Sequence, residues 1–416
     1  MHAAREQLRQ RADYTYKFNA GTGRHGWLRL TPAYSVKIVE EIVTRYGASL
    51  NILDPFCGTG TTALSAVNHG HDAATTDINP FLIWLARAKT AHYAPASIGG
   101  ASRAGAAALD LALQEAVVPA AEPPIHKIER WWPAGARRFL CHLKAAISDT
   151  AGSSSEVADL LKIAFCRSVI RLSNAAFNHQ SMSFKDDSQG AFDLGPEAGA
   201  GFLEDLRHVL AGAAQNPAGN AVVTLGDARD LPACIGKKFD VVVTSPPYAN
   251  RMSYIRELRP YMYWLDYLAN GRDAAELDWL AIGGTWGVAT SRLAGWSPSG
   301  EQWLPDDLPS VLSDIAHGDN ANGALLSNYV AKYCEDMSAH FASLRHVLNP
   351  GARIHYIVGN STFYGVLVPT EQIYAGMLRE YGFTDIDVRP IRKRNSKKEL
   401  IEFDVSAAWP GMGAPA

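Results

Sequence analysis

The stretch from Ser49 to His92 alternates between strand and helix patterns, and this constrains the fold more than any other feature of the chain. An apolar segment, "SLNILDPF", precedes "CGTGTTALSAVNHG", which has the pattern of a glycine turn followed by a helix. A second segment, "DAATTDINP", precedes a helical pattern from Phe81 to His92. Strands joined through helices form βαβ units, which belong to parallel sheets. We therefore predict an α/β fold with a doubly wound, mostly parallel sheet.

Later strand patterns add to this sheet, and two segments of different character interrupt them. The strand patterns are "NAVVTLGDARDL", "KFDVVVTSPPY", "GARIHYIVGN", "TDIDVRPI" and "LIEFDV". Residues 94–219 are rich in Ala and helical in period, which predicts a helical insertion. Residues 267–328 carry Trp among Gly and Pro, which predicts a loop-rich insertion. The core then consists of residues 1–93, 220–266 and 329–416, and either insertion is a candidate region for target recognition.

Composition narrows the class of protein. The 416 residues are 47% hydrophobic and 19% charged, which is typical of a globular chain with a large core. The first residues are too charged for a signal peptide, and no apolar run is long enough to cross a bilayer, so we expect a soluble, cytoplasmic protein. The five cysteines include no CxxC pair, which argues against a zinc site or disulfides. The net charge of −3 shows no global preference for nucleic acid, so such a surface would have to be local.

Acidic residues end three predicted strands around one glycine-rich turn. Asp54 precedes the turn, Asp77 ends the next strand, and Asp227 follows a later one. In doubly wound folds, glycines let a ligand approach the backbone, and the acid of the second strand binds a ribose hydroxyl pair. Three acids disfavour a polyphosphate and favour a cationic adenosine compound, which predicts S-adenosylmethionine as the cofactor. The residues expected to bind it are Asp54, Phe56, Gly58, Gly60, Asp77, Ile78, Asp227 and Ala228.

A second motif follows the buried strand pattern "FDVVV", which runs directly into "TSPPY". Pro246 and Pro247 each lack an N–H and have a fixed φ, so they end the strand in a stiff corner. An isolated Pro-Pro corner is most simply a strand-capping turn, and only the rest of the chain can give this one another role.

"DPFCGTGTT" followed by "TSPPY" resembles the paired motifs of the DNA amino-methyltransferases, in particular those that methylate cytosine at N4. The resemblance implies a seven-stranded methyltransferase sheet. Upstream, "RHGWLRLTPAYSVKIVEEIV" is similar to the family's N-terminal motif, which closes over the methionine end of the cofactor and implies a contact from Thr31. The long insertion between the Asp77 and Asp227 strands departs from the family's known motif arrangements.

The resemblance also implies a mechanism for the corner. The exocyclic amine of cytosine is a poor nucleophile because its lone pair is delocalised, so acceptors must hold its two hydrogens while the nitrogen becomes pyramidal. The Ser245 oxygen and the Pro246 carbonyl are expected to do this, Pro247 to stiffen the corner, and Tyr248 to stack on the base. The base must be flipped out of the duplex to reach them.

Cations in two places are candidate DNA contacts. Arg167 and Arg171 lie at i, i+4 on one helix face, with Lys185 downstream, and "RPIRKRNSKKE" carries Arg392, Lys393 and Arg394. A solvated loop is the alternative for the second group.

The expected function is therefore methylation of cytosine N4 in double-stranded DNA, with a cognate restriction endonuclease encoded nearby as a further partner. Adenine N6 methylation is the first alternative, and RNA or protein amide methylation is more distant. A catalytically silent nucleic-acid-binding protein of the same fold is the alternative outside enzymes.

Overall fold

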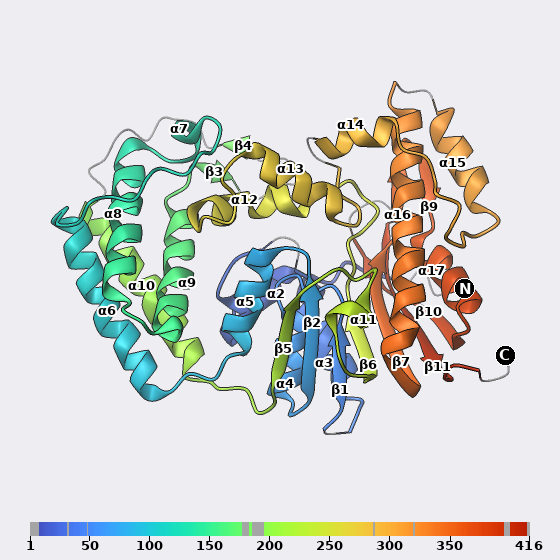
Figure 1. Ribbon diagram of the computed structural model, residues 1–416, viewed down its shortest axis with the longest axis horizontal. Coiled ribbons are helices and arrows are strands. Elements are labelled where there is room, and N and C mark those ends of the chain that lie inside the picture. Colours follow the sequence, from blue (N-terminus) through green and yellow to red (C-terminus); the bar gives the residue numbers. More distant parts are fainter. Residues whose placement is uncertain are drawn as a thin grey trace.

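A seven-stranded sheet forms the centre of the molecule (Figure 1). The computed structural model describes residues 8–30, 33–47, 49–176, 183–184, 195–285, 288–318, 321–394 and 400–413. The strands of the sheet, in spatial order, are β10 (Thr384–Lys393), β11 (Ile401–Trp409), β7 (Leu348–Gly359), β6 (Phe239–Thr244), β1 (Asn51–Asp54), β2 (Asp72–Asp77) and β5 (Ala221–Leu225). The order crosses over at β1, and only β11 runs antiparallel to its neighbours. The prediction of a doubly wound, mostly parallel seven-stranded sheet is confirmed.

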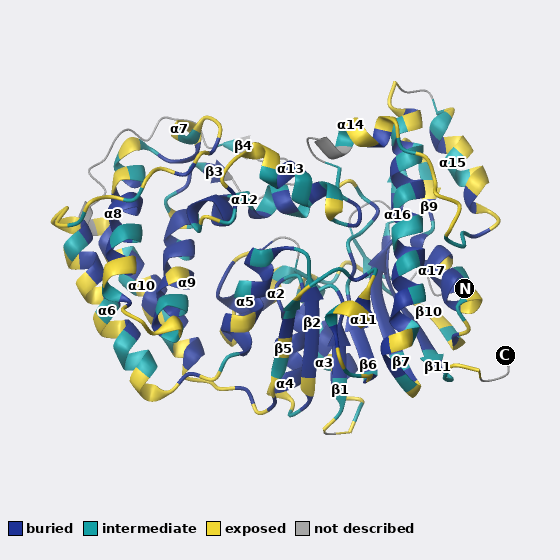
Figure 2. Cartoon of the chain, in the orientation of Figure 1, coloured by how far each residue is buried: buried dark blue, intermediate teal, exposed yellow. Residues whose placement is uncertain are grey.

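Helices cover both faces of this sheet. Side chains alternate along β1 and β6: Ile52 and Val241 join a cluster with α3 (Val36–Val43) and α4 (Thr61–Asn68), whereas Leu53 and Val242 join one with α16 (Gly323–Leu344) and α17 (Thr370–Glu380). Burial on both faces explains why these strands read as continuous apolar runs. In Figure 2 the central strands β6 and β7 are accordingly mostly dark blue, and the outer helices show exposed outward faces.

Local sequence signals set the elements around the strand ends. Gly60 adopts a φ of 73° directly before α4, and the Asn79 side chain accepts a hydrogen bond from Phe81 N at the start of α5 (Pro80–Thr90). The short elements α11 (Leu231–Cys234) and the 3-10 helix η3 (Arg345–Val347) precede β6 and β7. Two hairpins stand apart from the main sheet: β3 (Ala175–Ala176) with β4 (Ser183–Phe184), and β8 (Ser361–Phe363) with β9 (Val366–Val368).

The segment 94–219 forms a layer of helices beside the sheet (Figure 1). Its helices are α6 (Pro95–Leu113), α7 (Ile128–Trp131), α8 (Ala134–Thr150), α9 (Ser155–Arg171) and α10 (Gly195–Ala213). The N-terminal elements η1 (Ala12–Tyr14), α2 (Tyr16–Asn19) and η2 (Gly23–Gly26) precede α3. Buried Arg24 in η2 donates hydrogen bonds to the carbonyls of Lys89, Gly212 and Ala213, so it joins the N-terminal segment to α5 and α10.

Residues 267–328, which are predicted to be loop-rich, also contain several helices. After α12 (Tyr254–Trp264) this segment contains α13 (Gly271–Leu280), α14 (Val288–Ala294), α15 (Leu308–Ala316) and the start of α16. Two of these helices carry start signals: Asn270 and Asp273 form a capping box on α13, and Pro309 lies in the first turn of α15. Because Gly and Pro separate these helices, no helical period in the sequence is long enough to predict them. No helix in the described part of the chain has the length and apolar character needed to cross a membrane.

Candidate active site

A cavity of about 600 Å³ opens at the carboxyl ends of the parallel strands. This is the edge at which doubly wound sheets bind ligands. Both predicted halves of the site line the same cavity. The predicted residues in its wall are Phe56, Gly58, Asp77, Ile78, Asp227, Ala228, Ser245, Pro246, Pro247, Tyr248, Arg392 and Arg394.

Asp77 presents a carboxylate to the cavity from the end of β2. One oxygen accepts a hydrogen bond from Gly58 N at 3.0 Å and the other from Asn79 N at 2.9 Å. Burial raises the pKa of Asp77, and the hydrogen bonds from these backbone N–H groups lower it. Burial is the larger effect, so the pKa is about 6. Gly58 has a φ of 49°, so its turn brings the backbone close to the carboxylate. The turn fixes this carboxylate and leaves lone pairs on both oxygens for a ligand's hydroxyl groups.

Asp54 and Gly60, which are predicted to bind the cofactor, are not part of the cavity wall. Asp54 is fully buried, and one oxygen accepts hydrogen bonds from the Thr244 hydroxyl at 2.6 Å and from Phe56 N at 3.1 Å. Its other oxygen has no hydrogen-bond partner among the described residues, and burial raises its pKa to about 7. Gly60 allows α4 to pack on α5, since a Cβ there would lie 3.0 Å from the Ala86 Cβ. Both residues therefore stabilise the glycine turn through contacts outside the cavity.

The predicted catalytic corner is held by neighbouring elements. The Ser245 hydroxyl donates to the Ile357 carbonyl of β7 at 3.0 Å, which leaves its oxygen lone pairs to accept. The Pro247 carbonyl accepts from the Tyr333 hydroxyl at 2.8 Å. No described residue donates a hydrogen bond to the Pro246 carbonyl. The corner therefore offers two acceptors, Ser245 Oγ and the Pro246 carbonyl, in a fixed frame.

Tyr248 completes the corner. Its hydroxyl donates to Glu402 at 2.9 Å, and burial raises its pKa well above the usual value, so the phenol stays neutral. The guanidinium carbon of Arg394 lies 4.9 Å from the centroid of the Tyr248 ring. A base that stacks on this ring must therefore use the opposite face or displace Arg394.

In the basic run that begins at Arg389, for which phosphate contacts are predicted, Arg392 and Arg394 have partners within the protein. The Arg392 side chain forms an ion pair with Glu402 at 2.7 Å, and Arg394 donates to the Asn360 carbonyl at 2.7 Å. Both residues line the cavity. Lys393 is outside the cavity wall, and its backbone N–H donates to the Arg9 carbonyl. Residues 395–399 lie outside the described residues.

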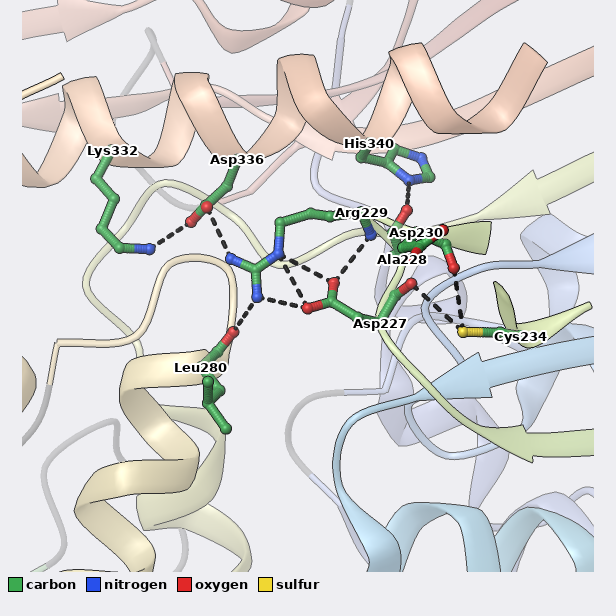
Figure 3. A network of polar contacts seen from close by, with 9 residues as sticks. All are labelled: Asp227, Ala228, Arg229, Asp230, Cys234, Leu280, Lys332, Asp336 and His340. Carbon is green, nitrogen blue, oxygen red and sulfur yellow. Dashed lines mark hydrogen bonds and ion pairs between the residues drawn. The ribbon is translucent and has the colours of Figure 1, made fainter. Parts of the chain in front are cut away.

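Asp227 belongs to a polar network between the core and the later helices (Figure 3). The Arg229 guanidinium donates to both Asp227 oxygens, to Asp336 of α16 at 2.8 Å and to the Leu280 carbonyl of α13 at 2.8 Å. The Ala228 carbonyl accepts from His340 Nδ1 at 2.8 Å, and burial lowers the pKa of this histidine to about 4. The predicted adenine end of the site is thus positioned by α13 and α16.

The two arginines of α9 have a structural role that accounts for them without DNA. Arg167 and Arg171 both form ion pairs with the buried carboxylate of Asp205 in α10, and Arg167 also donates to the Trp27 carbonyl at 2.8 Å. They join helices of the insertion to each other and to the N-terminal segment, and their contact with DNA stays a prediction. Lys185 and Thr31 lie outside the described residues.

Sequence reasoning missed several residues of the cavity. Glu402 is nearly completely buried in β11, and Tyr14, Tyr34 and Tyr254 also line the wall. The signal for Glu402 is an acid between apolar residues in "LIEFDV", because a buried carboxylate needs a partner. The tyrosines carry no comparable signal, since aromatic residues are common in any core.

The observed geometry fits S-adenosylmethionine. Asp77, the residue expected to hold a ribose, and Asp227 and Ala228, expected beside an adenine, line one cavity together with the glycine turn. Among the described residues, no group of three or more His, Cys, Asp or Glu is placed to hold a metal ion. The sheet order and this cavity define the class: the fold is that of the S-adenosylmethionine-dependent methyltransferases.

Two curated proteins and two solved structures are similar to this chain at low sequence identity. No protein-family model matches the chain. It is 21% identical over 443 residues to the Type II methyltransferase M.BsoBI of Geobacillus stearothermophilus, which covers 94% of this chain and 84% of the relative. It is also 22% identical over 352 residues to the Type II methyltransferase M.MvaI of Kocuria varians. This match covers 79% of this chain and 74% of the relative. Among solved structures, the rRNA methyltransferase aviRa from Streptomyces viridochromogenes is similar in two structures, each at 13% identity. For the first structure the TM-score is 0.27, and the match covers 91% of this chain and 86% of that chain. For the second structure the TM-score is 0.29, and the match covers 96% of this chain and 94% of that chain.

Proposed function

We propose that this protein methylates the exocyclic N4 amine of cytosine in double-stranded DNA. Its fold is that of methyltransferases, and both relatives named above are methyltransferases. The cofactor is S-adenosylmethionine. The observation that carries the finer proposal is that the Ser245–Pro246 acceptor corner lines the same cavity as Asp77 and the glycine turn. A base amine at the corner would therefore lie beside the cofactor.

The cofactor half of the cavity orients its ligand through fixed groups. The carboxylate of Asp77 accepts from ribose hydroxyls, and the loop of Asp227 and Ala228 borders the adenine. When bound, S-adenosylmethionine supplies an electrophilic methyl group. Thr31 is part of the proposal as a contact at the methionine end.

The acceptor corner prepares the amine for attack. Ser245 Oγ and the Pro246 carbonyl each accept one amine hydrogen, which favours a pyramidal nitrogen whose lone pair is free. Hydrogen bonds from Ser245 to Ile357 and from Tyr333 to Pro247 hold the corner, so little reorganisation is needed in the transition state. Both acceptors are uncharged. They therefore hold the hydrogens of cytosine's amine without the full negative charge that an Asp would bring.

The proposal includes base flipping, because the corner lies inside a cavity that a paired base does not reach. Either insertion, 94–219 or 267–328, is a candidate for target recognition, and both flank the core (Figure 1). We extend the proposal to a cytoplasmic location and to a cognate restriction endonuclease encoded nearby, from which the methylated DNA would be protected.

The test is to incubate diverse unmethylated DNA with the protein and labelled cofactor, and then to digest the DNA to nucleosides. N4-methylcytosine is the expected product. Label on adenine N6 alone would show that adenine, and not cytosine, is the target base. Absence of label would favour a catalytically silent protein.

The variant Ser245→Ala should lower kcat by about 100-fold or more, as loss of one preorganised transition-state hydrogen bond does elsewhere. Affinity for the cofactor should stay at the parental value. Ser65→Ala is the matched control, because this hydroxyl is buried in α4 with no partner among the described residues. Equal kcat for Ser245→Ala and the parent would remove Ser245 from the mechanism.

A further inference from the structure

A buried ion pair lies in the cavity wall beside the catalytic corner. Arg392 of β10 donates from Nε to one Glu402 oxygen at 2.7 Å and from a terminal nitrogen to the other at 3.1 Å. The two side chains are only 13% and 5% exposed. Glu402 also accepts the Tyr248 hydroxyl at 2.9 Å, so the pair is linked directly to the corner.

This pair leaves donors on Arg392 that have no protein acceptor assigned to them. A guanidinium has five N–H groups, and the two bonds to Glu402 use two of them. Among the described residues, Arg392 forms no side-chain hydrogen bond other than those to Glu402. Because Arg392 lines the cavity, its remaining N–H groups are available to a ligand bound there.

A cytosine held at the corner by its amine presents two acceptors on the same edge as that amine, the ring N3 and the O2 carbonyl. We propose that Arg392 is a specificity-determining residue that donates hydrogen bonds to N3 and O2 of the target cytosine. This inference rests on the proposed function and deepens it. On its Watson–Crick edge an adenine offers one acceptor, N1, and a C–H where cytosine has O2. A thymine presents an N–H at N3, which would oppose the guanidinium.

Glu402 explains how a cation is tolerated at this place. The amine nitrogen gains positive charge as it is methylated, and an isolated guanidinium nearby would oppose that charge. Paired with Glu402, Arg392 offers N–H donors with little net charge. The carboxylate also fixes the orientation of the guanidinium plane and of the Tyr248 hydroxyl, so base recognition and stacking share one frame.

Two variants test this role without leaving a buried unpaired charge. Arg392→Lys keeps the cation beside Glu402 but replaces the planar fork by a single ammonium. Arg392→Met combined with Glu402→Gln removes both charges together. Arg353→Gln is the matched control: Arg353 lies in the same sheet, forms an ion pair with Asp385 and is not part of the cavity wall.

The measurements are cofactor affinity by calorimetry, kcat and KM on diverse unmethylated DNA, and the ratio of N4-methylcytosine to N6-methyladenine after digestion. For both Arg392 variants we expect kcat/KM to fall by about 10- to 100-fold, mostly through KM, as loss of a bidentate base contact does. The fraction of label on cytosine should fall, and cofactor affinity should match the parent and Arg353→Gln.

A parental kcat/KM and product ratio in both variants would overturn the inference. So would an equal loss in Arg353→Gln, or a loss of cofactor affinity that accounts for the fall in kcat/KM, because either would indicate a structural role. If the parent protein itself places no methyl label on DNA, the proposed function fails and the inference fails with it. Label in the parent with unchanged variants refutes the inference alone.

Discussion

Asp54 and Asp77 show how one residue type serves two purposes at equivalent places. Both are the last residue of a parallel strand beside the glycine turn. Asp77 reaches the cavity, whereas Asp54 turns inward to the Thr244 hydroxyl and to Phe56 N. The sequence predicted both as cofactor contacts, because strand position is readable from pattern but side-chain direction is set by the neighbouring strand.

Asp77→Ala should weaken binding of S-adenosylmethionine by roughly 1–3 kcal/mol, because the ribose hydroxyls lose their acceptor. Calorimetric titration measures this. The control is Asp72→Ala, since Asp72 is exposed at the other end of β2 and is not part of the cavity wall. Equal affinity for the parent and Asp77→Ala would place the ribose elsewhere.

Asp54→Asn should make the free energy of unfolding less dependent on pH. Burial raises the pKa of Asp54 to about 7 in the folded chain from 3.8, so the folded state binds the proton more tightly. The stability from this group is complete below pH 3.8 and is lost as the pH rises through about 7. Relative to Asp54→Asn, the parent should lose about 2–3 kcal/mol between about pH 5 and pH 8. Urea unfolding at both pH values checks this, and parallel curves would contradict it.

At the scale of elements, the fold was predictable where one pattern dominates. Strand β6 follows from its valines and the two prolines, and α4 follows from the glycine turn. The roles of Arg167 and Arg392 were not predictable, because each depends on a partner from another element, Asp205 and Glu402. A cation looks the same in sequence whether it faces solvent or a buried carboxylate.

Arg229 shows the same dependence on partners between elements, since it connects the loop after β5 to α13 and α16 (Figure 3). Arg229→Met would leave Asp227 and Asp336 without this partner. We expect the free energy of unfolding to fall by about 2 kcal/mol, less than for a fully buried pair because the network is partly exposed. Urea denaturation measures the loss. Arg272→Met, at an exposed position of α13, is the control, and an equal effect in both variants would show that the network does not stabilise the fold.

At the scale of the whole molecule, the helical layer and the core share one hydrophobic cluster. Trp264 of α12 packs edge-on against Trp132 at 5.5 Å and Phe165 of α9 at 5.8 Å, and Tyr261 stacks on Phe81 of α5 at 5.5 Å. All five side chains are at most 3% exposed. The apolar contact therefore runs without interruption from the layer through α12 to the helix beside the glycine turn.

This continuity predicts that the layer and the sheet unfold as one unit. A ligand that binds only the folded state at about 100 times its Kd raises the free energy of unfolding by about 2.7 kcal/mol. Hydrogen exchange should show this increase for the slowest amides of both β6, which ends at the catalytic corner, and α8, which does not line the cavity. If S-adenosylmethionine protects β6 and leaves α8 unchanged, the layer opens independently. The buried aromatic residues of α12 would then be a contact between two separate units, and target recognition could move relative to the catalytic core.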